Sequence, residues 1–332
     1  MHTISIPSTA KNTYQGPTFE LVEQIEWDEF KRSGTHFSSR KRPLLVRGAL
    51  KHWPASERWT FERIAELQRR DGAEVRTKFQ IGVEQGPTAD GTAPVKPYLL
   101  ELARTQHEAR AAGHHLGGLL PAQRLAQLKP GEHFHIDWSY MKSTAEVTQP
   151  YLSLWDMLDE FPELKRDLRL GELWPGVRWD WSYSFLGPAH SVSGIHFDYP
   201  NNLFCQFSGV KEFMLFESDQ DPHMCASSKY DWGSKLSHID ITRLDEQPEQ
   251  AAHFARAHGV YARLEAGDAL YVPHRVWHCV VSLLPSVSLA VFGLTPYELL
   301  VDGAPSVFRA AAHALGLYGR GNCTCHGAGS GY

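Results

Sequence analysis

The feature that most constrains the fold is a series of eight short runs of β-branched and aromatic residues in the second half of the chain. The runs are Trp181 to Leu186, Gly194 to Asp198, Leu203 to Phe207, Glu212 to Phe216, Val260 to Leu264, Ala269 to Val272, Cys279 to Leu283 and Val287 to Phe292. Turns separate them, and the connections are too short for helical crossovers between parallel strands. Eight such strands in one module favour a double-sheet jelly roll over an open parallel sheet.

The first part of the chain has a mixed α/β pattern. Residues 1–18 are polar and contain two prolines, which predicts a loosely ordered lead-in. Phe19 to Phe30 has the apolar spacing of an amphipathic helix. Arg42 to Gly48 is an apolar run opened by a proline and closed by a glycine, which predicts a buried strand. Thr60 is predicted to cap a helix that continues to Arg69 or Arg70.

Three further segments have a predicted structure. Gly82 to Pro97 is rich in Gly, Pro, Thr and Asp and is predicted to be a loop. Tyr98 to Gln127 is predicted to be helical, with an interruption near Gly113 to Gly118. The segment from Val301 to His313 is predicted to return to helix before a Gly-rich tail.

The predicted fold class is therefore mainly β with an α/β N-terminal extension, forming a double-stranded β-helix of the jelly-roll type. One elaborated domain over residues 19–300, with a β core at about 179–295, fits this order of elements better than two independent domains. Residues 301–332 are expected to form a C-terminal helix and tail.

Composition limits the partners and the compartment. The 33 Lys and Arg against 38 Asp and Glu give a formal net charge of −5, which argues against a nucleic-acid binder that relies on attraction to phosphates. No apolar run approaches the roughly 18 to 20 residues of a membrane helix, so no membrane contact is expected. Five Cys in 332 residues, without a signal-peptide pattern, indicate a reducing compartment. The predicted location is the cytoplasm.

Two histidines and a carboxylate occur in a pattern that suits a mononuclear iron site. In Gly194-Ile-His-Phe-Asp198, His196 and Asp198 lie two residues apart, so on a strand both point to one face while Phe197 points to the other. A third ligand must come from another strand, and His278 lies 80 positions after Asp198 (278 − 198), beside a predicted strand. Two His and one carboxylate leave positions on Fe(II) open for a cosubstrate and dioxygen. The three side chains are the predicted metal ligands.

Other groups of metal-ligand residues compete with this site, because the chain has 18 His. His135-Ile-Asp137, preceded by His133, repeats the His-x-Asp pattern. Nothing downstream of this rival supplies the surroundings of an oxygenase site. Cys323-Thr-Cys-His326 offers three ligands in the Gly-rich tail, which makes a poor structural zinc site.

Lys211 lies within an otherwise apolar run, Phe207 to Phe216, on a predicted strand. A lysine that faces a barrel interior is costly unless it meets an anion, so one interpretation is that Lys211 binds a carboxylate. The other is that Lys211 stands at the strand end, after the Ser208-Gly209 turn, and reaches solvent. The residues alone leave both interpretations open. Asn202 precedes it on the neighbouring predicted strand.

These residues carry a family resemblance. Gly194 to Phe216, together with Gly267 to Leu283, closely resembles the cupin-like JmjC group of Fe(II)- and 2-oxoglutarate-dependent oxygenases, particularly the branch of the asparaginyl hydroxylase of hypoxia-inducible factor. Arg42 to Ala49, with Trp53-Pro54 and Trp59-Thr60, is similar to the opening strand and helix of that branch. The His-x-Asp, lysine and Gly-Asp-x-x-Tyr-x-Pro-x-x-x-Trp-His elements occur together, and the resemblance covers most of the chain.

The resemblance implies roles for individual residues. His196, Asp198 and His278 would be the ligands of Fe(II). Lys211 would pair with the distal carboxylate of the cosubstrate 2-oxoglutarate, and Ser193 stands where the family often has a hydroxyl that shares this task.

Three more positions follow from the resemblance. Asn202 would lie beside the metal-chelating end of the cosubstrate, and Tyr140 would be the family's tyrosine that also reaches the distal carboxylate. Ala290 is a departure, because relatives often have an Asn near the metal at this position. The departure bears on cosubstrate contacts and leaves the ligand triad unchanged.

The implied activity is that of a dioxygenase that uses Fe(II), 2-oxoglutarate and O2. It would hydroxylate a C–H bond of a protein side chain or a small molecule and release succinate and CO2. A second hypothesis is a non-redox metal-binding cupin that acts as an isomerase, a hydrolase or a binding module, for which Lys211 would be dispensable. A third is a barrel used only for protein interaction, with a vestigial site. The substrate is not readable from the residues.

Two groups of apolar residues have alternative interpretations. Aromatic side chains near the predicted ligands either line the site or pack in the core, and these are Trp179, Trp181, Phe197 and Tyr199. Four apolar residues share roughly one face of the predicted C-terminal helix, namely Val307, Phe308, Ala311 and Leu315. That face either covers the barrel or forms a homodimer, as in some relatives.

Overall fold

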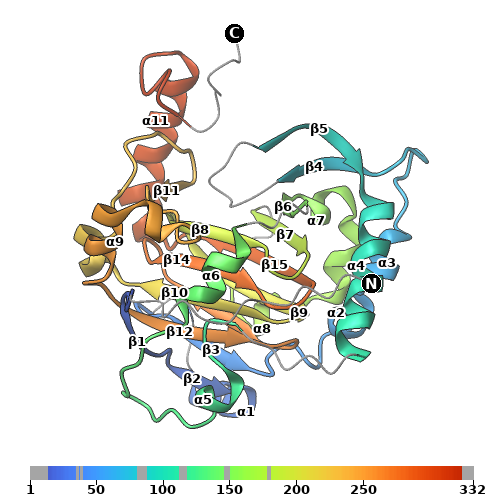
Figure 1. Ribbon diagram of the computed structural model, residues 1–332. Helices are drawn as coiled ribbons and strands as arrows, with labels where there is room; N and C mark the ends of the chain where they lie inside the picture. The colour runs from blue at the N-terminus through green and yellow to red at the C-terminus, as the bar shows by residue number, and fades with distance from the viewer. Residues whose placement is uncertain are drawn as a thin grey trace.

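The computed structural model describes residues 14–34, 37, 40–80, 88–111, 118–145, 150–177 and 181–323. Its centre is a pair of β-sheets that face each other across a hydrophobic interior (Figure 1). Sheet A has the strand order β1-β12-β10-β14-β8-β11, and sheet B has the order β2-β3-β13-β9-β15-β7-β6. The predicted jelly-roll fold is confirmed.

Each sheet has four core strands and additional strands at its edges. In sheet A the strands are β1 (Thr18–Leu21), β12 (His258–Leu264), β10 (Lys211–Phe216), β14 (Trp277–Ser282), β8 (Val192–Asp198) and β11 (Ser234–Leu236). In sheet B they are β2 (Gln24–Glu26), β3 (Leu44–Arg47), β13 (Ala269–Val272), β9 (Asn201–Ser208), β15 (Ser286–Gly293), β7 (Ser182–Gly187) and β6 (Leu152–Trp155).

The eight predicted runs correspond to strands β7 to β10 and β12 to β15. Successive strands within each group of four lie in opposite sheets, so the chain winds around the interior as a double-stranded β-helix. Side chains from both sheets fill that interior, among them Phe204, Phe213, Val280 and Ala290. Because strand side chains alternate between faces, every second residue points into this space and the others point outward.

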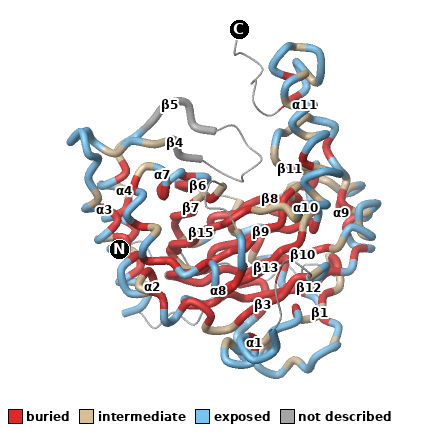
Figure 2. The backbone as a smooth tube through the Cα atoms, turned by 180° about the vertical axis from the view of Figure 1, so that it is seen from behind, coloured by how far each residue is buried: buried red, intermediate tan, exposed pale blue. Residues whose placement is uncertain are grey.

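Helices and loops cover the outer faces of both sheets, and Figure 2 shows the buried strands beneath them. The helical elements before β7 are α1 (Trp27–Ser33), α2 (Pro54–Arg58), α3 (Phe61–Ala65), α4 (Val95–Ala111), α5 (Ala122–Leu125), α6 (Trp138–Thr144), α7 (Met157–Glu160), η2 (Pro162–Asp167) and α8 (Leu170–Leu173). Those that follow are η3 (Ser218–His223), η4 (Leu244–Glu246), α9 (Pro248–Phe254), α10 (Pro296–Glu298), η5 (Leu299–Gly303) and α11 (Ala304–Ala314).

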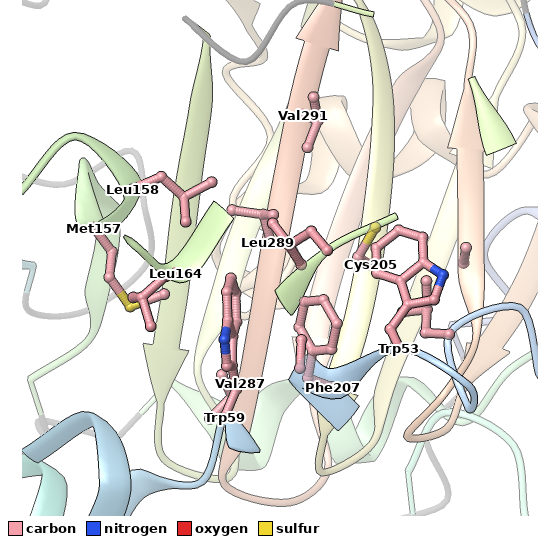
Figure 3. Close-up of a cluster of buried hydrophobic side chains, with 14 of the residues drawn as sticks. Trp53, Trp59, Met157, Leu158, Leu164, Cys205, Phe207, Val287, Leu289 and Val291 are labelled. Atoms are coloured by element: carbon pink, nitrogen blue, oxygen red, sulfur yellow. The ribbon is translucent and has the colours of Figure 1, made fainter. Parts of the chain in front are cut away.

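The outer face of sheet B packs on the N-terminal helices. Figure 3 shows this cluster, in which Trp53 and Trp59 meet Phe207 of β9 and Leu289 of β15. Thr60 caps α3 as predicted, since its hydroxyl accepts a hydrogen bond from Arg63 N, although the helix ends sooner than expected, at Ala65. The strand predicted between residues 42 and 48 is confirmed as β3.

The helix predicted over Phe19 to Phe30 is wrong for its first half. That segment forms β1, which pairs in parallel with β12, and β2, which pairs in parallel with β3, before α1 begins at Trp27. Phe19 is fully buried against Phe134 and Phe216. Pairing with the sheet edges and burial of Phe19 outweigh a weak helical pattern.

The loop predicted over Gly82 to Pro97 is also only partly correct. Residues 81–87 lie outside the described part, but Thr88–Pro94 forms β5, which pairs with β4 (Arg76–Gln80). Composition favours a loop there, whereas pairing with β4 satisfies the backbone donors and acceptors. The helix expected from Tyr98 onward begins earlier, as α4 at Val95.

A buried ion pair fastens the segment after α4 to the outer face of sheet A. Glu212 and Arg263 are both buried, Arg263 Nε lies 2.9 Å from a Glu212 carboxylate oxygen, and Tyr261 donates to the same carboxylate. Glu212 also accepts from Leu119 N at 2.7 Å. A Cβ at Gly118 would approach Glu212 Oε2 to 2.8 Å, so the close approach of the backbone requires glycine.

The helices in the described part of the chain include none that combines the length and the apolar character needed to cross a membrane. α11 and the β4–β5 hairpin project from the same end of the barrel, on opposite sides (Figure 1). The C-terminal helix predicted from Val301 to His313 is confirmed, with bounds shifted by a few residues and with a π-helical turn, η5, before it.

Candidate metal centre

The three predicted ligands come together on two neighbouring strands of sheet A. His196 and Asp198 lie at the end of β8, and His278 lies at the start of β14, directly opposite His196 in the antiparallel register. One possible ligand atom from each of the three residues lies within 4.8 Å of the others. No other group of three His, Cys, Asp or Glu side chains in the described residues meets in this way.

Backbone carbonyl groups orient both imidazole rings. Nδ1 of His196 lies 2.8 Å from Gly194 O, and Nδ1 of His278 lies 3.0 Å from Val276 O. A ring that donates from Nδ1 to a carbonyl presents the lone pair of Nε2 on its other side, which is how metal-binding histidines are commonly held. Nε2 of His278 lies 3.6 Å from Asp198 Oδ2.

The protonation state of His278 also suits a metal ligand. Burial, and then the nearby His196, lower the pKa of His278 to about 3. The ring is therefore neutral at physiological pH, and only the neutral imidazole binds a metal ion. A cation placed among these three side chains meets two imidazole nitrogens and one carboxylate.

The rival His-x-Asp motif has a structural role. Asp137 is the N-cap of α6, where its carboxylate accepts from Ser139 N at 2.9 Å. His135 is exposed, and its Nδ1 lies 3.1 Å from Pro17 O. In the tail motif, Cys323 is buried, and its backbone forms an isolated parallel β-bridge with Tyr230. Cys325 and His326 lie outside the described residues.

Lys211 points into the barrel interior, so the solvent-facing interpretation is wrong. The side chain is 1% exposed, and its Nζ lies 5.1 to 5.7 Å from the ring centroids of Tyr151, Phe185 and Phe204. Nζ also donates to the hydroxyl of Tyr151 at 3.2 Å. Aromatic faces stabilise a buried cation without neutralising it.

Tyr151, which sequence reasoning missed, occupies the place expected for Tyr140. Tyr140 lies on α6, its hydroxyl is 3.0 Å from His190 Nδ1, and burial followed by the charge of Glu212 raises its pKa. Glu212 is next to Lys211 on β10, so the two side chains point to opposite faces of sheet A. Tyr140 therefore lies on the outer face of sheet A, where it packs against the cluster that includes Met214 and Cys279.

Lys211 and the ligand triad lie at different depths of one barrel. His278 is opposite Leu215 on β10, and Lys211 precedes Leu215 by four residues. Four residues of strand correspond to about 13 Å. The interior therefore has metal-ligand groups at one level and a cation with a hydroxyl at another, which suits the two ends of an elongated dicarboxylate.

Asn202 lies inside the barrel, as the resemblance implies. Its strand partners, Val272 and Phe292, both belong to the interior cluster. Asn202 is 6% exposed, and its Oδ1 is buried with no hydrogen-bond partner among the described residues. A buried amide oxygen is costly to leave unsatisfied, so this atom fits a site that a polar ligand completes.

A bulge decides the direction of Ser193. With His278 opposite His196, a regular ladder would place residue 194 opposite Val280, but the register shifts and Ser193 takes that position. Val280 belongs to the interior cluster, so Ser193 also faces inward. Ala290 is fully buried in the same cluster, and its strand partners on either side in sheet B are Phe204 and Tyr183.

The aromatic residues near the ligands divide between the two faces. Phe197 packs outward against Trp277, with ring centroids 4.7 Å apart, and Tyr199 packs on the edge of Phe197. Trp181 lies against the interior cluster and contacts Trp232, which is 55% exposed. Trp179 lies outside the described residues.

Comparison with known proteins agrees with this geometry. A family profile described as a cupin-like domain matches residues 31–293, which is most of the chain. The chain belongs to the cupin-like JmjC family. Members of this family are typically Fe(II)- and 2-oxoglutarate-dependent oxygenases, and the His-Asp-His site gives this cupin-like chain a place for such a metal.

Individual relatives of this cupin-like JmjC chain differ in their named activities. Jumonji C domain-containing protein 5 of Drosophila melanogaster is 23% identical over 81% of this chain and 59% of its own length. tRNA wybutosine-synthesizing protein 5 of Gallus gallus is 27% identical over 51% of each chain. The human bifunctional peptidase and (3S)-lysyl hydroxylase JMJD7 is 22% identical over 72% of this chain and 73% of its own length. The chain thus spans between half and three-fifths of the length of the first two relatives.

Proposed function

We propose that this protein is an Fe(II)- and 2-oxoglutarate-dependent dioxygenase that hydroxylates a C–H bond of a protein side chain or a small molecule. The observation that carries the proposal is the placement of Lys211, buried in the same barrel as the triad and about 13 Å further along the strands. Metal binding alone does not require a buried ammonium at this depth, and burying a cation costs free energy.

The residues of the chain would divide the work as follows. His196, Asp198 and His278 would hold Fe(II), which supplies the oxidising chemistry once 2-oxoglutarate and O2 are bound. Lys211 would hold the distal carboxylate by a charge-assisted hydrogen bond, with the Tyr151 hydroxyl beside it. Asn202 and the inward Ser193 would add polar contacts, and the apolar interior would exclude water.

Two measurements test the proposal. Anaerobic addition of Fe(II) and 2-oxoglutarate to the apoprotein is expected to produce a weak visible absorption that needs both additions, because the cosubstrate would chelate the metal. In air, the loaded protein is expected to release succinate, at a rate that rises with the right substrate in a library of peptides and amino acids. Metal binding without the absorption and without succinate would favour the non-redox cupin instead.

We also propose that α11 mediates a homodimer. Val307, Phe308 and Leu315 are 66%, 76% and 74% exposed, so this face does not cover the barrel. A contiguous apolar face on an exposed helix is unusual for a monomer and is typical of an interaction surface. A second copy of the chain presents the same face and would bury it symmetrically.

Phe308→Glu is therefore expected to convert a dimer into a monomer. Losing a buried phenylalanine on each side costs about 2 kcal/mol per copy, which corresponds to a loss of more than about a hundredfold in dimer affinity. Light scattering after size exclusion would measure the mass. Leu100→Glu, an equivalent change at a 42% exposed leucine on α4, is the control and should leave the mass unchanged. A wild-type protein that is monomeric at high concentration would contradict the proposal.

A further inference from the structure

The C-terminal segment formed by α10, η5 and α11 contacts the two turns that adjoin the metal ligands. It leaves β15 at the metal end of the barrel and rises beside β8 and β11 (Figures 1 and 2). One turn, residues 273–276, joins β13 to β14 just before His278. The other, residues 199–200, follows Asp198 at the end of β8. The position of both turns therefore affects the geometry of the ligand set.

The 273–276 turn is connected to both ligand strands. Arg275 N donates to Asp198 O at 2.9 Å, and Val276 O lies 3.0 Å from His278 Nδ1, where it sets the ring orientation. Arg275 has a φ of 59°, a left-handed conformation that costs a non-glycine residue energy and persists only when its surroundings hold it. The surroundings of this turn are thus part of what orients His278.

Asn201 supplies part of that support. It is 1% exposed and points away from its neighbour Asn202. Its Oδ1 accepts from His274 N at 3.0 Å and from the Tyr271 hydroxyl at 2.8 Å. Its Nδ2 donates to Glu298 Oε2 at 2.6 Å. Asn201 therefore joins the turn before His278 to the first helix of the C-terminal segment.

Glu298 is the point at which the C-terminal segment meets the turn. Besides Asn201, its Oε2 accepts from Thr295 N at 2.7 Å, within the capping box of α10. Its Oε1 lies 3.8 Å from His274 Nε2, and Asp302 of η5 lies 3.7 Å from His274 Nδ1. The side chains of Glu298 and Asp302 are only 13% and 19% exposed, so both carboxylates lie mostly out of solvent beside His274.

A separate contact reaches the other turn. The guanidinium of Arg309 on α11 lies 5.6 Å from the ring centroid of Tyr199, the residue that follows Asp198. The C-terminal segment thus contacts the chain just after one ligand and just before another. A π-helical turn such as η5, which places Asp302 against His274, often occurs at functional sites.

We propose that the C-terminal segment braces the metal site, with Glu298 as a positioning residue. Glu298 holds the 273–276 turn by way of Asn201 and His274, and this turn in its place orients His278. This inference rests on the proposed metal site. It extends that site from three ligands to a support that begins at Pro296, 18 residues after His278 (296 − 278). Outer contacts made directly to a ligand typically change metal affinity tenfold to a hundredfold when they are removed, and Glu298 acts one contact further out, so the lower end of this range is expected.

Titration of the full-length apoprotein with Co(II), followed by calorimetry and visible absorption, tests the brace without a substrate. Glu298→Ala is expected to weaken Co(II) binding about tenfold and to change the visible bands, because the orientation of His278 is no longer fixed. Glu298→Gln, which keeps an acceptor for Asn201, should bind within twofold of wild type. Thr295→Ala is the matched control, because it breaks the capping hydrogen bond to Glu298 N and leaves the contacts to Asn201 and His274.

Three outcomes would overturn the brace. These are wild-type affinity for Glu298→Ala, an equal loss for Thr295→Ala, and a wild-type protein that binds no Co(II). If Glu298→Ala does not fold, the Co(II) affinity of Arg309→Ala tests the inference instead. This affinity is expected to fall about threefold, because the cation–π contact with Tyr199 is missing. Unchanged affinity in Arg309→Ala would then refute the inference. The proposed oxygenase function fails separately, when the wild type binds Co(II) normally but its Fe(II) form releases no succinate.

Discussion

His278→Ala is expected to lower metal affinity by at least two orders of magnitude and to abolish succinate release. Structural zinc sites have binding free energies of about 10 kcal/mol or more, and a similar share per ligand gives about 3 kcal/mol for one ligand of three. The remaining pair, His196 and Asp198, lies at the end of a single strand and covers a smaller part of the metal. Calorimetric titration with Fe(II) under argon, together with succinate release, measures both effects.

His135→Ala is the control for this experiment. It removes a histidine from the other His-x-Asp motif, at an exposed position outside the barrel interior. Its metal affinity and succinate release are expected to match the wild type. Retention of metal in His278→Ala, or loss of metal in His135→Ala, would contradict the assignment of the site.

The core of the fold could be predicted because its sequence pattern is local. Each of the eight strands is a short run with the β-branched and aromatic residues that suit a half-buried strand. The alternation of side chains also predicts that His196 and Asp198 face one way and Phe197 the other, as the structure shows. These inferences need only the order of residues along one strand.

The residues that periodicity alone could not place depend on contacts between segments. Ser193 is three positions from His196, so regular alternation would turn it outward, and only a register shift against β14 turns it inward. The family resemblance implies an inward-facing Ser193, whereas periodicity along the strand does not. Tyr151 reaches Lys211 from the position just before β6, an edge strand whose position depends on pairing with β7. No pattern near Tyr151 indicates this.

The helix predicted for the first half of Phe19 to Phe30 is wrong for a related reason. The segment that forms β1 and β2 has apolar residues at helical spacing, but the edges of both sheets offer unpaired backbone groups that it satisfies as strands. The support of the metal site by Glu298 is equally invisible in sequence, because it requires knowing that the chain returns to the 273–276 turn after β15. Signals of this kind appear only when segments distant in sequence are brought together.

Lys211→Met is expected to raise the KM for 2-oxoglutarate more than any other change away from the metal ligands. The substitution keeps the volume of the side chain but removes the charge, so the distal carboxylate of the cosubstrate would be buried without a partner. Breaking a buried ion pair in this way costs about 3 to 5 kcal/mol, which corresponds to a loss of more than about a hundredfold in apparent cosubstrate affinity.

A graded series around Lys211 separates the assignments. Tyr151→Phe removes one neutral hydrogen-bonding group beside Lys211, worth about 1 kcal/mol, so the KM for 2-oxoglutarate should rise about fivefold. Tyr140→Phe should leave it unchanged, because Tyr140 lies on the opposite face of β10. Substrate-independent succinate release at varied 2-oxoglutarate measures all three variants. A larger effect for Tyr140→Phe than for Tyr151→Phe would reverse the tyrosine assignment, and a silent Lys211→Met would remove the basis for a dicarboxylate cosubstrate.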